Sequence, residues 1–270
     1  MEYLELNVEN IPDVLKDELI YRLSGEGFES FLDTDNGFKA YISSDLFLSK
    51  KIEPFLNEYK VTFTWKIIPE QNWNEEWEKN YDAVIIGNKC HIRAPFHDPL
   101  PGIQHEIIIE PKMSFGTAHH ETTALMIELI LETDCSGKTI LDMGCGTGVL
   151  AILARKTGAA SVVAVDNDEW SFNNAQENIV KNDTDGIDVV LGDINNLKDQ
   201  RFDIVFANIN RNVLLEQIPR YSVILPKGDL LLSGFYETDL EMITGKAEEH
   251  DFHLIRYLAK NNWVAAKFRK

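Results

Sequence analysis

The sequence predicts an α/β chain in which a small α+β domain precedes a larger domain built on a doubly wound, mostly parallel sheet. Over about the first 70 residues, strand and helix patterns follow one another in the order β-α-β-β-α-β. From residue 138 onward, short apolar strands alternate with helical segments, as in a parallel sheet covered by helices. The last strand patterns, over 252–258 and 263–268, predict an antiparallel hairpin that closes one edge of that sheet.

The first domain is predicted over residues 1–70. Residues 3–8 alternate between apolar and polar side chains as a strand does, and a helical pattern follows them. Asn36-Gly37 is typical of a hairpin turn between two short strands. A helical pattern over 43–59 and a strand pattern over 61–68 complete the order, which is that of a ferredoxin-like domain.

A connecting helix is predicted over residues 71–82, between the two domains. Trp73, Trp77 and Tyr81 recur four residues apart, so they share one face of this helix. Packing of the three rings against a neighbouring element is the simpler explanation of this aromatic face. We therefore assign no chemistry to it.

The second domain is predicted over residues 83–270. It begins with two strand patterns, which are candidates for pairing with each other, and an apolar helix. Strands and helices then alternate. The predicted elements are strands at 83–96, 104–111, 138–144, 161–166, 187–193, 202–209 and 229–235, and helices at 122–132, 149–159 and 169–182.

The composition describes a chain with enough apolar residues for a sizeable core and with a strongly acidic balance. Hydrophobic residues make up 44% of the chain and charged residues 26%, and the net charge is −18. This charge disfavours a protein whose affinity comes from nucleic-acid phosphates, so no direct nucleic-acid binding is expected. It is compatible with a basic protein partner, although solubility alone also explains it.

The chain carries no pattern of export or membrane insertion. MEYLELNVEN lacks the basic and apolar regions of a signal peptide, and no apolar run approaches the length of a bilayer span. Cys90, Cys135 and Cys145 match neither a disulfide framework nor a paired-ligand metal site. We therefore expect reduced thiols in a cytoplasmic protein that has no membrane partner.

The stretch FGTAHHETT, residues 115–123, concentrates side chains that bind metals or move protons. It differs by one residue from HExxH, the zinc motif with histidines at i and i+4, because Ala124 stands where the second histidine would be. His119 and His120 cannot form a pair instead, since adjacent helical residues point about 100° apart. No metal site is expected here.

The most informative segment is LDMGCGTGVLAI, in which a strand ends at Asp142, three glycines follow and a helix begins. Such a loop lets the backbone of a helix N-terminus approach a ligand closely. The loop has no lysine, so it is not a P-loop, and the dinucleotide pattern GxGxxG that starts at Gly144 fails at Val149. The remaining interpretation is DxGxGxG, the glycine loop of S-adenosylmethionine-dependent methyltransferases.

The ends of the following strands support this interpretation. One strand ends in Asp166, and an acid at this position can accept hydrogen bonds from ribose hydroxyls in nucleotide-binding α/β folds. The alternative role for Asp166 is to cap the next helix, which Asn167 or Asp168 could do instead. The fourth strand ends in ANINR, with Asn208 at the place where many amino-group methyltransferases begin an Asn-Pro-Pro-Tyr motif.

Together these motifs resemble the ribosomal protein L11 methyltransferases, the PrmA family, over essentially the whole chain. The family has a stretch close to AFGTGTHPTT, then LDxGCGxGxLAI, VDxD, ANI and LSG. This chain has SFGTAHHETT, LDMGCGTGVLAI, VDND, ANI and LLSGF. The chain departs from the pattern at Ala118, His119, Glu121 and Asn210-Arg211, which bear on the shape of the acceptor pocket.

The resemblance implies a ferredoxin-like domain for substrate recognition and a Rossmann-like class I methyltransferase domain. It implies transfer of methyl groups from S-adenosylmethionine to the α-amine and the lysine side chains of a large-subunit ribosomal protein, L11. The nearest alternative is a methyltransferase that acts on another protein, a nucleic acid or a small-molecule amine. A module that binds the cofactor without catalysis is the alternative from a different class.

The resemblance also implies the site residues. The FGT stretch would cover the cofactor, with His120 in a structural role. Asn208 would accept a hydrogen bond from the incoming amine, and it would also touch the cofactor. The predicted cofactor-binding residues are Thr123, Gly144, Asp166 and Asn208, followed by Thr122, which is the alternative to Thr123, and by Gly146 and Phe115.

Aromatic side chains near strand ends are candidates for holding the methylated product through cation–π contacts. The candidates are Phe115, Phe206, Phe235 and Tyr236. Ordinary packing is the simpler role for aromatic residues at such positions.

Overall fold

The computed structural model of the chain describes residues 3–34, 36–47, 49–68, 81–112, 114–197 and 200–270. The chain forms two compact units, Met1–Asn80 and Tyr81–Lys270. Residues 71–80 of the expected connecting helix, with Trp73 and Trp77, lie outside the described residues. The two residues that follow them are not helical.

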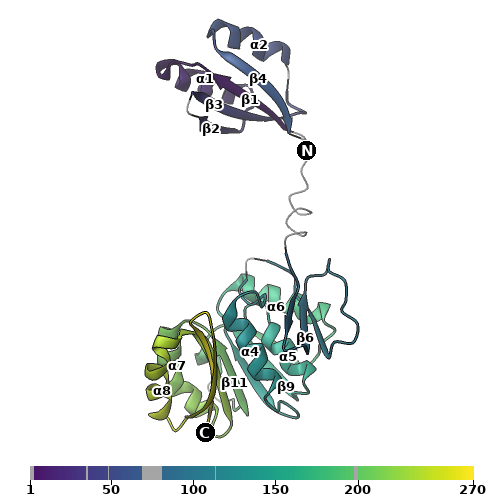
Figure 1. The fold of residues 1–270 in the computed structure, drawn as a ribbon, viewed down its shortest axis with the longest axis vertical. Coiled ribbons are helices and arrows are strands. Elements are labelled where there is room, and N and C mark those ends of the chain that lie inside the picture. Colours follow the sequence, from purple (N-terminus) through teal and green to yellow (C-terminus); the bar gives the residue numbers. More distant parts are fainter. Residues whose placement is uncertain (1–2, 35, 48, 69–80, 113, 198–199) are drawn as a thin grey trace. The chain divides into compact units, whose positions relative to one another are not determined.

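The first unit is an antiparallel sheet with two helices (Figure 1). Its strand order is β2-β3-β1-β4, and each neighbouring pair is antiparallel. This arrangement confirms the ferredoxin-like fold that the order of the elements predicts. The elements are β1 (Tyr3–Glu9), α1 (Asp13–Gly25), β2 (Ser30–Thr34), β3 (Gly37–Ser43), α2 (Ser49–Glu58) and β4 (Thr62–Ile68).

Alternation along the strands decides which face of this sheet is covered. Leu6 and Val8 of β1 are buried in one core together with Leu19 of α1 and Leu56 of α2, so both helices pack on the same face. The helical pattern predicted over 43–59 is realised only from Ser49. Residues 44–46, at the start of the predicted pattern, form turns instead. The N–H groups of Leu46 and Phe47 donate there to the carbonyls of Ser43 and Ser44.

The second unit begins with a small three-stranded sheet. Its strands are β5 (Val84–Ile86), β6 (Cys90–Arg93) and β7 (His105–Ile108), in the order β5-β6-β7. β5 pairs with β6 in antiparallel fashion, and β6 pairs with β7 in parallel. The strand patterns in this part of the sequence therefore do pair.

The larger sheet has seven strands in the order β10-β9-β8-β11-β12-β14-β13. Each neighbouring pair is parallel except the two pairs that β14 makes, so the predicted C-terminal hairpin is confirmed. Its strands are β8 (Thr139–Met143), β9 (Ser161–Asp166), β10 (Ile187–Leu191), β11 (Ile204–Asn208), β12 (Asp229–Tyr236), β13 (His253–Lys260) and β14 (Trp263–Arg269). The accompanying helices are α4 (Glu121–Leu131), α5 (Val149–Lys156), α6 (Glu169–Lys181), α7 (Arg211–Ile224) and α8 (Leu240–Glu248), with short 3-10 turns at Ile194–Leu197 and Glu237–Asp239.

Helices cover both faces of the large sheet (Figure 1). Residues of α4, α5 and α6 share one buried cluster with residues of the sheet, and residues of α7 and α8 share the other. After β8 the chain adds β9 and β10 on one side, and it then returns to place β11 on the other side of β8. The carboxyl ends of β8 and β11 therefore flank a topological switch point, where open α/β sheets bind their ligands.

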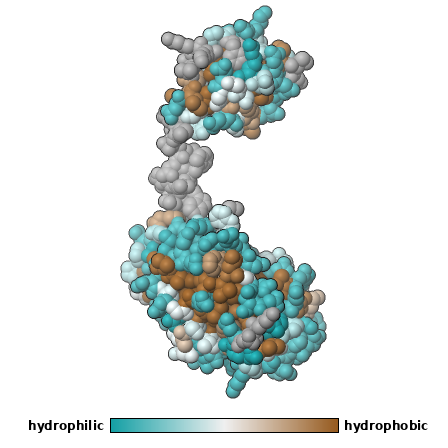
Figure 2. Space-filling view, turned by 180° about the vertical axis from the view of Figure 1, so that it is seen from behind, coloured by the Kyte–Doolittle hydropathy of each residue, from teal (hydrophilic) through white to brown (hydrophobic). Residues whose placement is uncertain are grey.

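The surface of the second unit is mostly hydrophilic on the face that Figure 2 shows, around an exposed apolar area. This agrees with the acidic balance of the sequence, in which 44 Asp and Glu residues outnumber 26 Lys and Arg residues. Among the described residues, none of the helices is both long and apolar enough to cross a bilayer.

Candidate active site

The glycine loop lies where β8 ends and α5 begins, at the carboxyl edge of the large sheet. Its three glycines, Gly144, Gly146 and Gly148, have positive φ angles of 72°, 53° and 78°. Asp142, the fourth residue of β8, accepts a hydrogen bond from the backbone N–H of Ala151 at 3.1 Å. This bond ties the end of the strand to the first turn of the helix and sets the course of the loop between them.

Two of the glycines are needed because other parts of the site come close. A Cβ atom on Gly144 would overlap the side chain of Ile209, which follows Asn208 at the end of β11. A Cβ atom on Gly146 would overlap the backbone carbonyl of Phe115. Gly146 is therefore required for packing of the FGT stretch against the loop, a reason that the sequence motif alone does not reveal.

Asp166 lies at the end of β9 with its carboxylate against the glycine loop. Its Oδ2 accepts the N–H of Gly146 at 2.9 Å, and its Oδ1 accepts the N–H of Asp168 at 3.1 Å. The cap of α6 is Asp168, whose carboxylate accepts the N–H of Ser171 at 2.9 Å. Asp166 is thus not the cap. Each of its oxygens keeps a second lone pair that a hydroxyl group can use.

Asn208 ends β11 on the other side of β8. Its Nδ2 donates to the Oγ1 of Thr123 at 3.3 Å, and its Oδ1 is buried and has no hydrogen-bond partner. Thr123 itself is 1% exposed. Since buried polar atoms are nearly always paired in folded proteins, the free Oδ1 marks a place where a donor is missing.

The FGT stretch is fastened to the glycine loop through Thr147. The N–H of Thr147 donates to the carbonyl of Phe115 at 2.9 Å, and its hydroxyl donates to the carbonyl of Gly116 at 2.6 Å. The FGT stretch, residues 115–123, therefore forms a wall of the site at the glycine loop. It brings Phe115, Thr122 and Thr123 beside the strand ends.

The two histidines of the stretch have separate structural partners. His120 caps α4, where its Nδ1 lies 3.3 Å from the N–H of Thr122 and 2.8 Å from that residue's Oγ1. The His119 ring lies 2.9 Å from the carbonyl of Asp82 and 3.0 Å from the hydroxyl of Thr117. Within the described residues, no group of three or more His, Cys, Asp or Glu side chains could hold a metal ion.

A cavity of about 250 Å³ opens beside Asn208. Its lining residues are Phe115, His120, Thr122, Asn208, Ile209, Asn210, Gly234 and Trp263. The ring centroids of Trp263 and His120 are 4.8 Å apart, and those of Trp263 and Tyr236 are 4.1 Å apart. The cavity therefore has an aromatic wall next to an unpaired carbonyl oxygen.

Two of the four aromatic candidates do not lie at this wall. Phe206 and Phe235 are fully buried in the core of the unit, so they pack rather than bind. Phe115 and Tyr236 are about half exposed, and Trp263 was not predicted. Trp263 reaches the site because it faces Tyr236 across the β12–β14 pair, and the sequence does not show which strand β14 joins.

Asp142 is the buried acid beneath the site. Burial is the main cause that raises the pKa of its carboxyl to about 7; the bond from Ala151 acts against this rise, and the nearby Asp166 carboxylate adds to it. Its Oδ2 has that one bond, and its Oδ1 has no partner. The carboxyl edge of the sheet thus contains a carboxyl group whose ionisation the surrounding protein disfavours.

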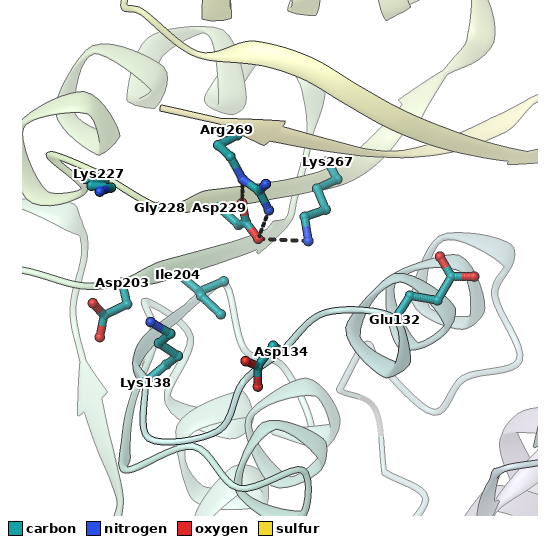
Figure 3. A pocket seen from close by; sticks show the side chains of 10 residues that line it. All are labelled: Glu132, Asp134, Lys138, Asp203, Ile204, Lys227, Gly228, Asp229, Lys267 and Arg269. Carbon is teal, nitrogen blue, oxygen red and sulfur yellow. Dashed lines mark hydrogen bonds and ion pairs between the residues drawn. The ribbon is translucent and has the colours of Figure 1, made fainter.

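A larger cavity, of about 620 Å³, lies at the opposite, amino edge of the sheet (Figure 3). Here Asp229, at the start of β12, bonds to Lys267 at 2.8 Å and to Arg269 at 2.7 Å. Asp203 accepts bonds from the N–H and the hydroxyl of Thr139. These charges hold the beginnings of β8, β11 and β12 together, and the cavity lies far along the strands from the glycine loop.

Comparisons with known proteins agree with this geometry. A family model described as "Ribosomal protein L11 methyltransferase (PrmA)" matches residues 16–270. The chain is 43% identical to the ribosomal protein L11 methyltransferase of Phocaeicola vulgatus, over 99% of both chains. It is 44% identical to that of Porphyromonas gingivalis, over 98% of this chain and 92% of the relative.

The chain belongs to the ribosomal protein L11 methyltransferase family. A crystal structure of a ribosomal protein L11 methylase from Lactobacillus delbrueckii subsp. bulgaricus matches its fold with a TM-score of 0.66 at 29% identity. That match covers 70% of this chain and 100% of the other. Membership confirms the S-adenosylmethionine-dependent methyltransferase that the glycine loop predicts, and the cradle of glycines together with Asp166 fits that cofactor.

The departures from the family pattern are accommodated locally. Ala118 keeps a positive φ of 68° where the family pattern has glycine. Glu121 replaces proline at the first position of α4, and its carboxylate accepts the side-chain amide of Asn261 at 2.7 Å. Asn210 caps α7, and Arg211 pairs with Asp239 at 2.8 Å.

Proposed function

We propose that this chain transfers methyl groups from S-adenosylmethionine to amino groups of ribosomal protein L11, namely the α-amine and lysine side chains. Family membership supports the substrate. The observation that carries the chemistry is the buried Oδ1 of Asn208, an acceptor without a donor at the edge of the aromatic-walled cavity. An incoming amine supplies the missing N–H. Because the substrate is ribosomal, we place the activity in the cytoplasm.

The cofactor-binding roles follow from the geometry of the carboxyl edge. Asp166 is assigned to the ribose hydroxyls, and the loop from Gly144 to Gly146 to the close backbone approach. Thr123 and Asn208 would form the wall next to the reacting methyl group, because they are hydrogen-bonded to each other at the end of β11. Thr122 and Phe115 line the cavity and would lie on its acceptor side.

The chain must supply alignment and a neutral amine. The cofactor carries a methyl group already activated on a sulfonium, so positioning of the nitrogen accounts for most of the catalysis. Free lysine has a pKa of about 10.4 and an α-amine about 7.8, so a lysine substrate must lose a proton to water before its nitrogen attacks the methyl group. The apolar, aromatic wall at Phe115 and Trp263 favours the neutral amine by desolvation. Asn208 would then accept an N–H and aim the lone pair.

The first unit is assigned to substrate recognition. We place this function in residues 1–70, with 71–82 as the link and 83–270 as the catalytic part. Residues 1–70 contain 7 Lys and Arg and 14 Asp and Glu, a net charge of −7. Ribosomal proteins are generally basic, so an acidic module aids encounter and orientation. Removal of this part should abolish methylation of L11 while binding of the cofactor survives.

The test of the proposed function is methylation of purified L11, followed by the intact mass of the substrate. The full chain should add mass in steps of one methyl group, and treatment with RNase should change nothing. Asn208→Ala should lower turnover about 100-fold while it weakens S-adenosylhomocysteine binding much less. The matched control is Asn173→Ala, because Asn173 is exposed on α6. If L11 gains no methyl group while a nucleic acid or small amine does, the proposed substrate is wrong.

A further inference from the structure

Asn174 and Asn178 of α6 and Asn182, its C-cap, recur every four residues, and the last two bind the chain at the end of β7 and just beyond it. Asn182, just beyond the helix, accepts the N–H of Ile108 at 2.8 Å and donates to the carbonyl of the same residue at 2.6 Å. Asn178 accepts the N–H of Glu110 at 2.8 Å and donates to the carbonyl of Thr147 in the glycine loop at 2.9 Å. The side chains of Asn182 and Asn178 thus attach the chain to the helix at two successive points. We call this series of hydrogen bonds the asparagine ladder and each asparagine one rung.

The spacing of the rungs has a simple physical basis. Four residues of α-helix rise about 6.0 Å, and two residues of extended chain advance about 6.6 Å. A helix with asparagine at every fourth position can therefore bind every second N–H of an extended chain. The third asparagine in this register is Asn174, and the next N–H in the register is that of Lys112, where the chain forms a bend instead of continuing the extended course.

Asn174 does not make this third rung in the structure. It is 1% exposed, and neither its Oδ1 nor its Nδ2 has a hydrogen-bond partner. Lys112 is nevertheless already against the same helix, since its Nζ lies 2.5 Å from the carboxylate of Glu177. A buried amide with both groups unpaired is unfavourable, and an apolar side chain of the same shape would be more stable there.

The unmade rung lies next to the cofactor site. Thr147 accepts from Asn178 and holds Phe115, so the ladder and the FGT stretch bind the same residue of the glycine loop. Phe115 in turn lines the cavity beside Asn208. Any movement that brings the backbone of Lys112 onto Asn174 therefore bears on the loop and on the cavity together.

We propose that Asn174 is a positioning residue that accepts the backbone N–H of Lys112 when the cofactor is bound, and so completes the ladder. This inference rests on the proposed cofactor site. The cofactor-free protein keeps an unpaired amide, and the bound protein gains its hydrogen bond. The side chain thus lowers stability without ligand and raises affinity for ligand.

The test compares Asn174→Leu with Asn178→Leu in the full chain, because leucine keeps the branched shape of asparagine. Without ligand, Asn174→Leu should raise the melting temperature by about 2–6 °C, since it removes an unpaired amide. The same variant should bind S-adenosylhomocysteine about 3- to 10-fold more weakly. Asn178→Leu should lower the melting temperature, because it leaves the N–H of Glu110 and the carbonyl of Thr147 unpaired.

A second measurement follows the hydrogen bond itself. In the wild type, hydrogen exchange of the Lys112 N–H should slow when S-adenosylhomocysteine is added, and in Asn174→Leu it should not. A melting temperature lowered by Asn174→Leu, or an unchanged affinity, would overturn the proposed rung. If the wild type itself does not bind S-adenosylhomocysteine, the failure belongs to the cofactor site and takes the inference with it.

Discussion

The two edges of the large sheet differ in how their polar groups are satisfied. At the amino edge a cavity of about 620 Å³ is lined by charged side chains, and Asp229, Asp203 and Lys267 all have partners. At the carboxyl edge a cavity of about 250 Å³ has fewer charges, yet the Oδ1 atoms of Asn208 and Asp142 are buried without partners. The number of charges and the size of the cavity favour the amino edge as a binding site, whereas these two unpaired atoms favour the carboxyl edge, where we place the cofactor.

A ligand would explain this difference, because it supplies hydrogen bonds to atoms that the protein itself leaves unpaired. Groups that hold strands together are paired in the folded chain, because an unpaired buried group costs stability. Groups that await a ligand remain unpaired without it, and the fold compensates elsewhere. The comparison therefore predicts that variants at the amino edge lower stability without changing binding, whereas variants of the unpaired or ligand-facing groups at the carboxyl edge weaken binding or raise stability.

The largest effect is expected at the carboxyl edge. Asp166→Ala should weaken S-adenosylhomocysteine binding about 1000-fold, or about 4 kcal/mol, because two hydrogen bonds to a charged group are lost. Calorimetric titration measures this change. Asp168→Ala is the matched control, since it removes the cap of α6 and should cost about 1 kcal/mol of stability with little loss of affinity. Similar losses of affinity in both variants would remove the ribose assignment.

The next prediction uses the pH dependence of the unpaired acid. The pKa of Asp142 is raised to about 7 in the folded state, so between about pH 4 and 7 the folded state keeps this carboxyl protonated while the unfolded state does not. The free energy of unfolding therefore falls as pH rises through this range. Asp142→Asn removes this loss. Its free energy of unfolding should exceed that of the wild type by roughly 3–4 kcal/mol at pH 8, since each of about three pKa units corresponds to about 1.4 kcal/mol, and by much less at pH 4. Urea unfolding at several pH values measures the difference, and a constant difference would mean that Asp142 ionises normally.

Much of this contrast could be predicted from the sequence, and the part that could not is long-range. The glycine loop, Asp166 and Asn208 lie at strand ends, and parallel strands bring their carboxyl ends together at one edge. Trp263 was missed because its position depends on the pairing of β14 with β12. The asparagine ladder joins residues 68 and 74 positions apart, so no local pattern reveals it. The reason for Gly146 depends in the same way on a distant carbonyl, that of Phe115.

The paired acid at the amino edge should show the opposite pH dependence. Burial raises the pKa of Asp229, but the hydrogen bonds and charges of Arg269 and Lys267 together hold it below its usual range. The stability that ionised Asp229 contributes is therefore fully present above the unfolded pKa of about 3.9, and it is lost as pH falls through the lower pKa of the folded state. Asp229→Asn should cost about 2 kcal/mol at pH 7 and less near pH 3. Affinity for S-adenosylhomocysteine should not change, and a large loss would mean that the two edges are coupled.

The smallest expected effect, none at all, comes from removal of metal ions. Acidic side chains gather at the amino edge, and two histidines and a glutamate gather in the FGT stretch, so both regions resemble cation sites in composition. At the amino edge, however, Asp229 and Asp203 already bind protein donors. In the FGT stretch, His119 and His120 each contact their own threonine, and Ala124 leaves no second ligand for His120 on α4. A carboxylate or imidazole that is hydrogen-bonded in this way must break those bonds to take a metal.

We therefore expect EDTA to change neither the methylation rate nor the melting temperature of the full chain. A loss of rate that zinc restores would show that the histidines exchange their threonine contacts for a metal, and a lower melting temperature alone would place the ion at the amino edge.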